Sequence, residues 1–359
     1  MKRILHIIGK MDRAGAETML MNLYRSIDRS KIQFDFITFT YDKGDYDDEI
    51  LALGGKIFPI IASNSLARMI ELYKFLKAHS EYQIIHTHVL LNNAFHLTAA
   101  LMAGVKNRIS HSHSTSNGGK NYLAKTYEIV AKKVINHLAT CKIACGYEAG
   151  QYLYNNVKKV LVLPNAVNVR EIHHIVEISR KSFIFDKAKL NIIHVARFMS
   201  VKNHIFVLDI AEALIERDTN FIIYLVGDGP LRSEIEQRIQ SRNLGQHVKL
   251  LGLRSDIIAL MANSDIMILP SLHEGFPVVL VESQAVGLST LVSDNVSQEV
   301  DLGLGMIDFL PINHAKIWAE KIVDFSPVNL SNEQIFHKLS SQGFDIFQNS
   351  QRLEQLYSV

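Results

Sequence analysis

Short apolar runs alternate with segments of helical periodicity along most of the chain, and this alternation restricts the fold more than any other feature of the sequence. Strands that alternate with helices form parallel sheets, because each connection between parallel neighbours has to cross over the sheet. One series of such units covers residues 4–163, and a second covers residues 190–293. The sequence therefore predicts an α/β protein with two doubly wound, Rossmann-like halves.

The periodicity also places the individual elements. In the first series, strands are expected at 4–8, 34–39, 56–60, 83–88, 108–112, 140–144 and 160–163, and helices at 18–26, 66–78, 93–103, 122–138 and 147–154. In the second, strands are expected at 190–195, 220–226, 248–251, 266–269 and 290–293, and helices at 204–216, 230–241, 256–261 and 277–286. Two further helices are expected at 311–324 and 332–355.

Length and apolar content fit two domains with a core each, since the chain has 359 residues and 48% apolar residues. The apolar run near the start is interrupted by His6, Gly9 and Lys10, so we expect no signal peptide. No other stretch approaches the roughly 20 apolar residues of a membrane helix. We therefore expect a cytoplasmic protein that does not span a membrane.

Charge is distributed unevenly between the halves. Residues 1–165 contain 21 Lys and Arg against 13 Asp and Glu, whereas residues 166–359 contain 17 against 23. The overall charge of +2 thus combines a first half at +8 with a second half at −6. This pattern predicts that the first half meets an anionic surface or substrate, and nothing in it indicates nucleic acid.

The stretch 271–283 carries the most specific turn chemistry. An apolar strand ends at Leu269, Gly275 allows a tight turn, and Pro277 suits the first turn of a helix that ends near Val286. A helix start presents backbone N–H groups and a partial positive charge to an anion. Glu274 and Glu282 stand eight residues apart around it. They are either solvated surface acids or binding groups, and the turn chemistry favours binding.

Glu274-Gly275-Phe276-Pro277 followed by Glu282 resembles the E-x7-E motif of retaining glycosyltransferases of family 4. That family has the GT-B fold, in which two Rossmann-like domains with parallel sheets face each other across a cleft. The resemblance implies that Glu274 and the amides of Gly275 and Phe276, next to Pro277, hold the donor sugar. It implies that Glu282 binds the ribose hydroxyls.

The same resemblance extends to the domain limits. The segment 164–168 resembles the family's P-N-G-V-D junction, with Ala166 and Asn168 as departures. We expect an acceptor domain at 1–168 and a nucleotide-sugar donor domain at 169–335, in which the charged stretch 169–188 is a linker with a peripheral helix. Residues 336–359 are expected to form a C-terminal helix that returns to the first domain, as in other GT-B proteins.

Two cations follow the first strand of the second half. Arg197 and Lys202 lie in one loop at the expected carboxyl end of that strand, where a guanidinium and an ammonium can together neutralise a diphosphate. The alternative is a pair of solvated surface cations, and the position at a strand end favours phosphate binding. Their spacing matches the R-x4-K pattern of family 4, which implies that both bind the donor diphosphate without a metal.

Other donor contacts are implied by looser matches. Gly227 and Gly229 form a G-x-G-P turn after a strand, and glycines let backbone approach a ligand closely. The segment with Leu253 and Arg254 resembles the part of the family that meets the nucleobase through backbone groups. Gly15 lies in a loop that contacts the donor phosphates or shapes the acceptor cleft in the family, although Ala14 replaces the first glycine of the usual pair.

Two H-x-H pairs end neighbouring strands of the first half, His86 with His88 and His111 with His113. The resemblance implies that His113 stands beside the donor sugar. H-x-H pairs can also bind zinc, but no carboxylate accompanies them and alternating histidines share a strand face only as a pair. We therefore expect no metal ligand and no cofactor beyond the nucleotide sugar.

The D-x-D at 45–47 lies far from a strand end, which excludes it as a metal–nucleotide motif.

A basic helix is expected from Lys120 to Lys133, with Leu123, Tyr127 and Val130 on its apolar face. It is either an ordinary surface helix whose lysines extend over the core or a helix that lies on anionic lipid. The basic first half corresponds to the acceptor half of family 4, and this resemblance favours contact of the helix with a membrane surface.

Together with these features, the resemblance to family 4 implies a metal-independent, retaining hexosyltransferase that uses a nucleotide diphosphate sugar, with UDP as the expected nucleotide. The whole chain resembles enzymes of bacterial capsule and exopolysaccharide assembly, which implies a saccharide acceptor linked to lipid and a position at the inner face of the cell membrane. Two alternatives stay open. A sugar-nucleotide epimerase of the same fold would need no acceptor, and a non-catalytic nucleotide-sugar-binding module would turn nothing over.

Overall fold

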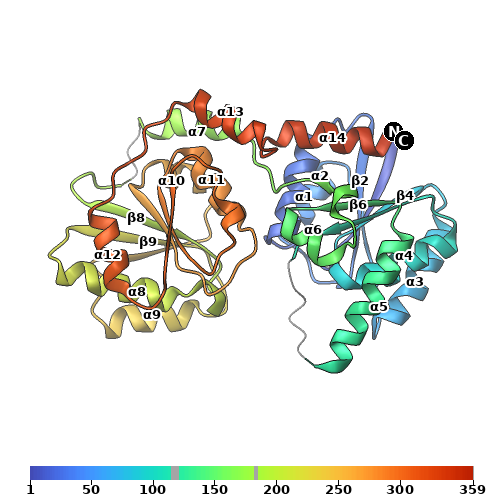
Figure 1. The fold of residues 1–359 in the computed structure, drawn as a ribbon, viewed down its shortest axis with the longest axis horizontal. Helices are drawn as coiled ribbons and strands as arrows, with labels where there is room; N and C mark the ends of the chain where they lie inside the picture. Colours follow the sequence, from blue (N-terminus) through green and yellow to red (C-terminus); the bar gives the residue numbers. More distant parts are fainter. Residues whose placement is uncertain (115–120, 182–184, 359) are drawn as a thin grey trace. The chain divides into compact units, whose positions relative to one another are not determined.

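The computed structural model describes residues 1–114, 121–181 and 185–358, and its contacts divide the chain into two compact units (Figure 1). The first unit combines Met1–Ala166 with Ile346–Val359, and the second is Val167–Asp345. The expected limits were residues 168 and 335. The segment that returns to the first unit is therefore shorter than the expected 336–359.

The first unit is built on a seven-stranded parallel sheet in the order β3-β2-β1-β4-β5-β6-β7. Its strands are β1 (Lys2–Ile7), β2 (Ile32–Thr38), β3 (Ile57–Pro59), β4 (Ile84–Thr87), β5 (Asn107–Ser112), β6 (Cys141–Ala144) and β7 (Leu161–Val162). Its α-helices are α1 (Gly15–Ser26), α2 (Asp47–Ala52), α3 (Ser65–Ala78), α4 (Asn93–Ala103), α5 (Tyr122–Leu138), α6 (Tyr147–Leu153) and α14 (Ile346–Ser358).

Successive residues of these strands enter different cores, as the period of two requires. Ile4 of β1 packs in a core with α1 and α14, whereas Leu5 packs in a second core with α3, α4 and α5. Helix α14 packs into the first core through Leu353 and Tyr357, which are both fully buried. One sheet face is thus covered by α1 and α14 and the other by α3, α4 and α5.

The second unit is built on a six-stranded parallel sheet in the order β10-β9-β8-β11-β12-β13. Its strands are β8 (Leu190–Val195), β9 (Phe221–Val226), β10 (Val248–Gly252), β11 (Ile266–Leu269), β12 (Thr290–Ser293) and β13 (Ile307–Leu310). Its α-helices are α7 (Val169–Ser179), α8 (His204–Glu216), α9 (Arg232–Ser241), α10 (Ile257–Ala262), α11 (Val278–Val286), α12 (Ala315–Val323) and α13 (Asn332–Ser341). Helices α7, α10, α11 and α13 share one core, and α8, α9 and α12 share the other.

Three elements differ from the sequence prediction. Helix α2 was not predicted, because Ile50 is its only buried residue and leaves no apolar period to detect. Strand β13 was not predicted either, because it is a four-residue edge strand that contains the exposed Asp308. The single helix expected at 332–355 is in fact α13 and α14, separated at Gly343, which adopts a φ of +84° that favours glycine.

Within the described residues, no helix combines the length and the apolar character that a membrane crossing requires.

Candidate functional site

The predicted donor-site residues of the second unit follow the carboxyl ends of adjacent strands. Arg197 and Lys202 follow β8, Gly227 follows β9, Leu253 follows β10 and Glu274 follows β11. The strand order places β8 between β9 and β11, so the connections leave this point in opposite directions. Ligands of open parallel sheets bind at the carboxyl edge of such a switch point. The fold therefore gathers these loops at one edge.

Lys202 and Glu274 form an ion pair at this edge. Lys202 Nζ lies 2.6 Å from Glu274 Oε2, and the two side chains are only 20% and 13% exposed. Ser271 Oγ donates a hydrogen bond of 2.5 Å to the other carboxylate oxygen, Oε1. Both oxygens of Glu274 are thus held, one by a cation and one by a buried hydroxyl.

Backbone bonds fix the two loops that carry this pair. The amide of Leu272 donates to the carbonyl of Val201 at 2.8 Å, and Asn203 Nδ2 donates to the carbonyl of Pro270 at 3.1 Å. Asn203 takes a left-handed conformation, with φ +54°, between the 3₁₀ turn Ser200–Lys202 and helix α8. The loop after β8 and the loop after β11 therefore form one connected structure.

Arg197 differs from Lys202 in its surroundings. Its side chain is exposed and forms no ion pair with any residue that the structure describes. A cation without a local carboxylate keeps its full charge for an incoming anion. Of the two predicted phosphate-binding cations, Arg197 is thus available, whereas Lys202 is shared with Glu274.

The start of α11 corrects two details of the sequence prediction. Pro277 is the N-cap residue with an extended backbone and precedes the first turn, which begins at Val278. Gly275 does not adopt a left-handed conformation, so its turn does not require glycine. A Cβ added at Gly275 would meet no atom within 4 Å. Phe276, in contrast, stacks on Phe344 at 5.6 Å between ring centroids.

Glu282 lies on α11, where its partly buried carboxyl group forms no hydrogen bond with any residue of the described ranges. Burial raises its pKa to about 7. The cause is desolvation, which penalises the charged carboxylate. Such a group gains from a ligand that donates hydrogen bonds to it.

Gly227 and Gly229 are needed for close packing against the loop after β8. Gly227 has a φ of +139°, and a Cβ there would lie 2.1 Å from the carbonyl oxygen of Ala196. A Cβ at Gly229 would lie 2.6 Å from the carbonyl oxygen of Phe198. The G-x-G-P turn thus brings the loop after β9 against the loop after β8.

Leu253 and Arg254 follow β10. Leu253 is 68% exposed, which is unusual for a large apolar side chain and leaves it open to a ligand. The guanidinium of Arg254 is bound by Asp256 at 2.7 and 2.8 Å.

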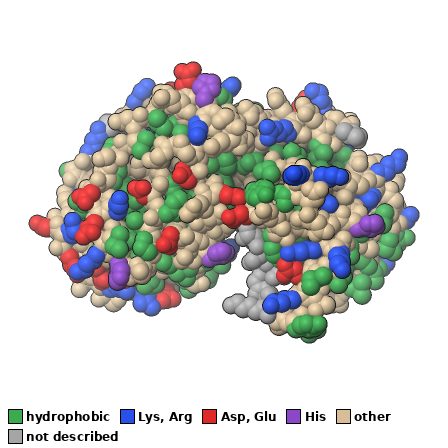
Figure 2. All heavy atoms as spheres, in the orientation of Figure 1, with side chains coloured by type: hydrophobic (Ala, Val, Ile, Leu, Met, Phe, Trp, Pro, Cys, Tyr) green, Lys and Arg blue, Asp and Glu red, His purple; other side chains and the backbone are tan. Residues whose placement is uncertain are grey.

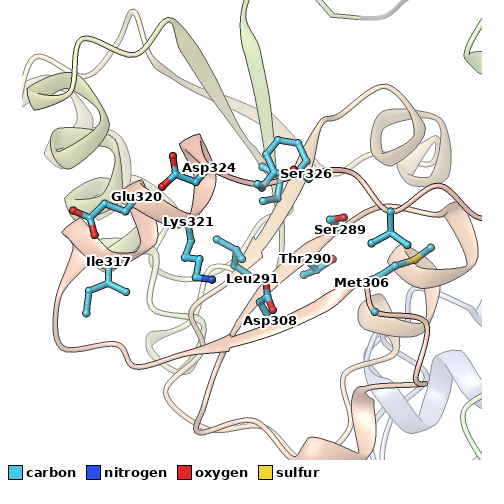
Figure 3. A pocket seen from close by; sticks show the side chains of 14 residues that line it. Ser289, Thr290, Leu291, Met306, Asp308, Ile317, Glu320, Lys321, Asp324 and Ser326 are labelled. Atoms are coloured by element: carbon cyan, nitrogen blue, oxygen red, sulfur yellow. The ribbon is translucent and has the colours of Figure 1, made fainter.

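A pocket lies at the opposite edge of the same sheet. It includes Ile266 and Thr290, the first residues of β11 and β12, and the neighbouring Met306. Figure 3 shows Lys321 extending toward Asp308 within this pocket. None of the predicted site residues lines it, and it lies at the amino edge of the sheet, so we do not assign it to the donor site.

In the first unit, Gly15 is the first residue of α1 and is exposed, with no atom within 4 Å of an added Cβ.

His113 follows β5 and is partly exposed. Its Nε2 lies 2.9 Å from His88 Nδ1, and its Nδ1 is buried without a hydrogen-bond partner among the described residues. Burial lowers the pKa of His113 to about 3, so the ring is neutral at physiological pH.

Sequence reasoning missed two contributors to the donor site, Ser271 and Asn203. Both are polar residues beside predicted ones, Ser271 three positions before Glu274 and Asn203 directly after Lys202. For Ser271 the available signal was a polar residue shortly after an apolar strand, and for Asn203 it was a polar residue directly before a predicted helix. Only the structure shows that Ser271 binds the Glu274 carboxylate within the loop after β11, and that Asn203 braces that loop from the loop after β8.

Two family models match the chain: "Glycosyltransferase Family 4" over residues 13–171 and "Glycosyl transferases group 1" over residues 176–301. The chain is 38% identical to the "Putative glycosyltransferase EpsF" of Bacillus subtilis (strain 168), with 100% of this chain and 97% of that protein covered.

More distant relatives are matched over almost their full length. Identity is 26% with the Escherichia coli "UDP-Gal:alpha-D-GlcNAc-diphosphoundecaprenol alpha-1,3-galactosyltransferase", covering 95% of this chain and 96% of that protein. It is 24% with the Staphylococcus aureus "Capsular polysaccharide biosynthesis glycosyltransferase CapH", covering 99% of both.

Among solved structures, the fold is similar to that of Anabaena Alr3699/HepE, crystallised with UDP and with UDP-glucose. The TM-scores are 0.78 and 0.77, the identity is 18%, and both chains are covered completely. This likeness confirms the predicted fold class of two Rossmann-like halves.

Proposed function

This chain belongs to glycosyltransferase family 4, and from that membership we propose that it transfers a hexosyl unit from a UDP-sugar to a saccharide acceptor with retention of configuration. The observation that carries the proposal is the Lys202–Glu274–Ser271 cluster at the carboxyl edge of β8 and β11. Arg197 follows the same strand β8 and forms no ion pair with the described residues. The UDP-galactose donor in the name of the E. coli relative and the UDP complexes of HepE support UDP.

Each part of the nucleotide-sugar donor has proposed binding residues in the second unit. Glu282 accepts hydrogen bonds from the ribose hydroxyls, and Glu274 with the amides of Gly275 and Phe276 holds the hexose. Gly227, Gly229, Leu253 and Arg254 line the nucleotide. The open space beside Gly275 supports close approach of a sugar, because no atom of the described residues lies within 4 Å of a Cβ built there.

Arg197 and Lys202 stabilise the diphosphate as it leaves. Charge on the leaving oxygens grows in the transition state, and prearranged cations lower the barrier most where charge develops. With these two cations in place, we propose that the reaction needs no metal at the diphosphate. Because no nucleophile for a double displacement was found in the sequence, the proposed route is front-face attack by the acceptor hydroxyl. His113 is proposed to stabilise the donor sugar.

The proposed acceptor is a lipid-linked saccharide in surface polysaccharide assembly. The E. coli relative is named for a diphosphoundecaprenol substrate and the S. aureus relative for capsular polysaccharide. A cytoplasmic enzyme that works on such an acceptor has to reach the inner face of the membrane, so we propose a peripheral position there.

Helix α5 supplies a surface for that position. Leu123, Tyr127 and Val130 were predicted to share one apolar face. The structure exposes all three, and of the helix only Ala131 and Ile135 are buried. Leu123 is 78% exposed. Lys125 and Lys133 are exposed on the same helix, whereas Lys120 lies outside the described residues. Figure 2 shows hydrophobic and basic side chains together at the end of the first unit where Figure 1 places α5.

The first experiment is a thermal-shift panel of UDP, GDP, ADP and CMP without added metal, on the wild type and on Glu282→Ala, followed by turnover of UDP-sugars with and without a lipid-linked acceptor. We expect UDP to raise the melting temperature of the wild type alone, and turnover to require acceptor. Turnover without acceptor would identify an epimerase. Binding without any turnover would identify a non-catalytic module, and no binding of any nucleotide would refute the donor site.

A further inference from the structure

Five histidines lie together on one face of the first-unit sheet. His6 on β1 is the register partner of His86 on β4, and neighbouring strands in register present partners on the same face. His88 stands two residues after His86, and His111 and His113 stand two residues apart on and after β5. In the sequence, the two H-x-H pairs are separate, 25 residues apart. The order β1-β4-β5 places the two pairs beside each other and beside His6.

Contacts between the rings connect them. His88 Nε2 lies 3.1 Å from His6 Nδ1, and His88 Nδ1 lies 2.9 Å from His113 Nε2. The ring of His111 lies 4.0 Å from that of His113 and 5.4 Å from that of His88, between centroids. The cluster therefore has His88 at its centre.

Hydrogen bonds within the cluster leave ring nitrogens unsatisfied. A neutral imidazole has one donor and one acceptor, so the three rings of His6, His88 and His113 satisfy each other only along one chain. Both ring nitrogens of His111, Nδ1 of His113 and Nε2 of His6 are buried and have no partner among the described residues. A buried polar group that lacks a hydrogen-bond partner destabilises the fold. A metal ion that accepts a nitrogen lone pair from each ring would satisfy one of the two free nitrogens of His111.

We propose that His88, His111 and His113 bind one divalent transition-metal ion, with Zn²⁺ as the best fit. One nitrogen from each of the three lies within 4.8 Å of the others. Zinc–nitrogen bonds of about 2.0–2.1 Å in a tetrahedron set neighbouring nitrogens roughly 3.3 Å apart, so small ring movements bring them to bonding distance. The 2.9 Å separation of His88 Nδ1 and His113 Nε2 is already close to that value.

Surrounding groups suit this ligand set. When His88 binds through Nδ1, its Nε2–H donates to His6 Nδ1, and metal-bound histidines usually donate their second N–H to an outer acceptor. His111 gains a bond for a nitrogen that otherwise has none. Partly exposed His113 gives an ion access from the carboxyl edge of the sheet. His86 is engaged elsewhere, because its Nδ1 lies 2.6 Å from the hydroxyl of Tyr357.

An all-imidazole set selects zinc and its neighbours, since magnesium and calcium require oxygen ligands. Three protein ligands leave a fourth position for water or another small ligand. The ion would tie the carboxyl ends of β4 and β5 together and hold the His113 ring in one orientation. The site belongs to the first unit and shares only His113 with the proposed transfer reaction. Its test measures metal binding and not turnover, so failure of the metal site and failure of the proposed function are distinguishable.

The test uses the tag-free full chain, stripped with a chelator and titrated with Zn²⁺ by calorimetry. We expect one ion per chain, a higher melting temperature with zinc, and at least a tenfold weaker affinity in His111→Ala and in His113→Ala. Outer partners of metal ligands typically contribute 10–100-fold to affinity, so His6→Ala should also weaken binding. His96→Ala is the matched control, because His96 is buried on α4 and bonds to Thr87 Oγ1.

A second measurement avoids variants that fail to fold. X-ray absorption of the zinc-loaded wild type should count about three imidazole ligands near 2.0 Å, and the Co²⁺-loaded chain should show the intense visible bands of a four-coordinate ion. Oxygen-only coordination, affinity unchanged in both ligand variants, or no stoichiometric binding by the folded wild type would each overturn the proposal.

Discussion

Lys202 Nζ lies 2.6 Å from Glu274 Oε2, so a cation proposed for the diphosphate and a carboxylate proposed for the sugar are partners of each other. The two residues are 72 positions apart, on loops that leave β8 and β11. A partly buried pair of this kind holds both side chains in one geometry without a ligand. An incoming diphosphate would therefore share Lys202 with Glu274, and the cluster is prearranged for its ligand.

Removal of the Lys202 ammonium should affect the chemical step most. We expect Lys202→Met to lower kcat by about 10²–10³-fold, the range found when one prearranged group that stabilises transition-state charge is lost. Ser271→Ala should lower kcat only about tenfold, because it frees one oxygen of Glu274 but leaves the ion pair with Lys202 intact. Steady-state kinetics with a UDP-sugar measures both, and Lys316→Met, an exposed lysine paired with Glu216, is the control. Equal kcat in Lys202→Met and Lys316→Met would contradict the proposed role.

UDP affinity should rise with pH through about 7. The pKa of Glu282 is raised to about 7, so the carboxyl group is mostly protonated below that pH and ionised above it. If ribose hydroxyls donate to the carboxylate, Kd should fall by up to tenfold per pH unit below 7 and then level off. Calorimetry between pH 5.5 and 8.5 measures this, and Glu282→Gln should give a flat profile. A wild-type profile as flat as that of the glutamine variant would rule out the ribose contact.

The same pKa predicts an effect on stability. Because the folded-state pKa is higher than that of the unfolded chain, the unfolded state binds fewer protons between about 4.5 and 7. The contribution of Glu282 to stability is therefore complete below about pH 4.5 and is lost as the pH rises through 7. We expect Glu282→Gln to raise the melting temperature relative to wild type at pH 8 more than at pH 5. Scanning calorimetry at both pH values measures this effect. An equal difference in melting temperature between the two proteins at pH 5 and pH 8 would be inconsistent with a partly buried carboxyl group that titrates near pH 7.

Glycines of the donor loops should separate into structural and ligand-facing positions. Gly227→Ala should reduce the free energy of unfolding by about 2 kcal/mol or more, since its φ of +139° and the 2.1 Å approach to Ala196 leave no room for a Cβ. Gly275→Ala should leave stability unchanged and weaken UDP-sugar binding, because its Cβ would occupy open space. Denaturant unfolding and calorimetry measure the two effects, with Gly245→Ala, also in open space, as the control. Wild-type affinity in Gly275→Ala would indicate that no sugar lies there.

Several features of the fold could be predicted because local chemistry fixes them. Helix α4 and strand β11 have the predicted limits, since a buried apolar run or a regular helical period marks them. Strand β13 and helix α2 could not be predicted, because their own residues carry little apolar pattern and their place depends on neighbours. The same holds for the break at Gly343, where a single glycine ends α13 inside a long helical period.

The site residues divide in the same way. The strand ends of Lys202 and Glu274 are visible in the sequence, but their 2.6 Å contact depends on β8 and β11 being neighbours, which a strand count does not reveal. The histidine cluster is a clearer case. Two H-x-H pairs and His6 come from three separate strands, and only the order β1-β4-β5 brings them together.

Helix α5 should bind anionic membranes through its exposed side chains. We expect Leu123→Ser with Ile129→Ser to abolish sedimentation with vesicles of phosphatidylglycerol and phosphatidylcholine, because these residues are 78% and 57% exposed and lose their apolar contact with the lipid. Lys125→Glu with Lys133→Glu should weaken binding on anionic vesicles and leave neutral vesicles unaffected, since each lysine near an anionic surface contributes about 1 kcal/mol that salt screens. Ile215→Ser, at an exposed apolar position of the second unit, is the control. If both double variants sediment with vesicles as the wild type does, the proposed membrane contact of α5 is wrong. That result would not affect the proposed donor site.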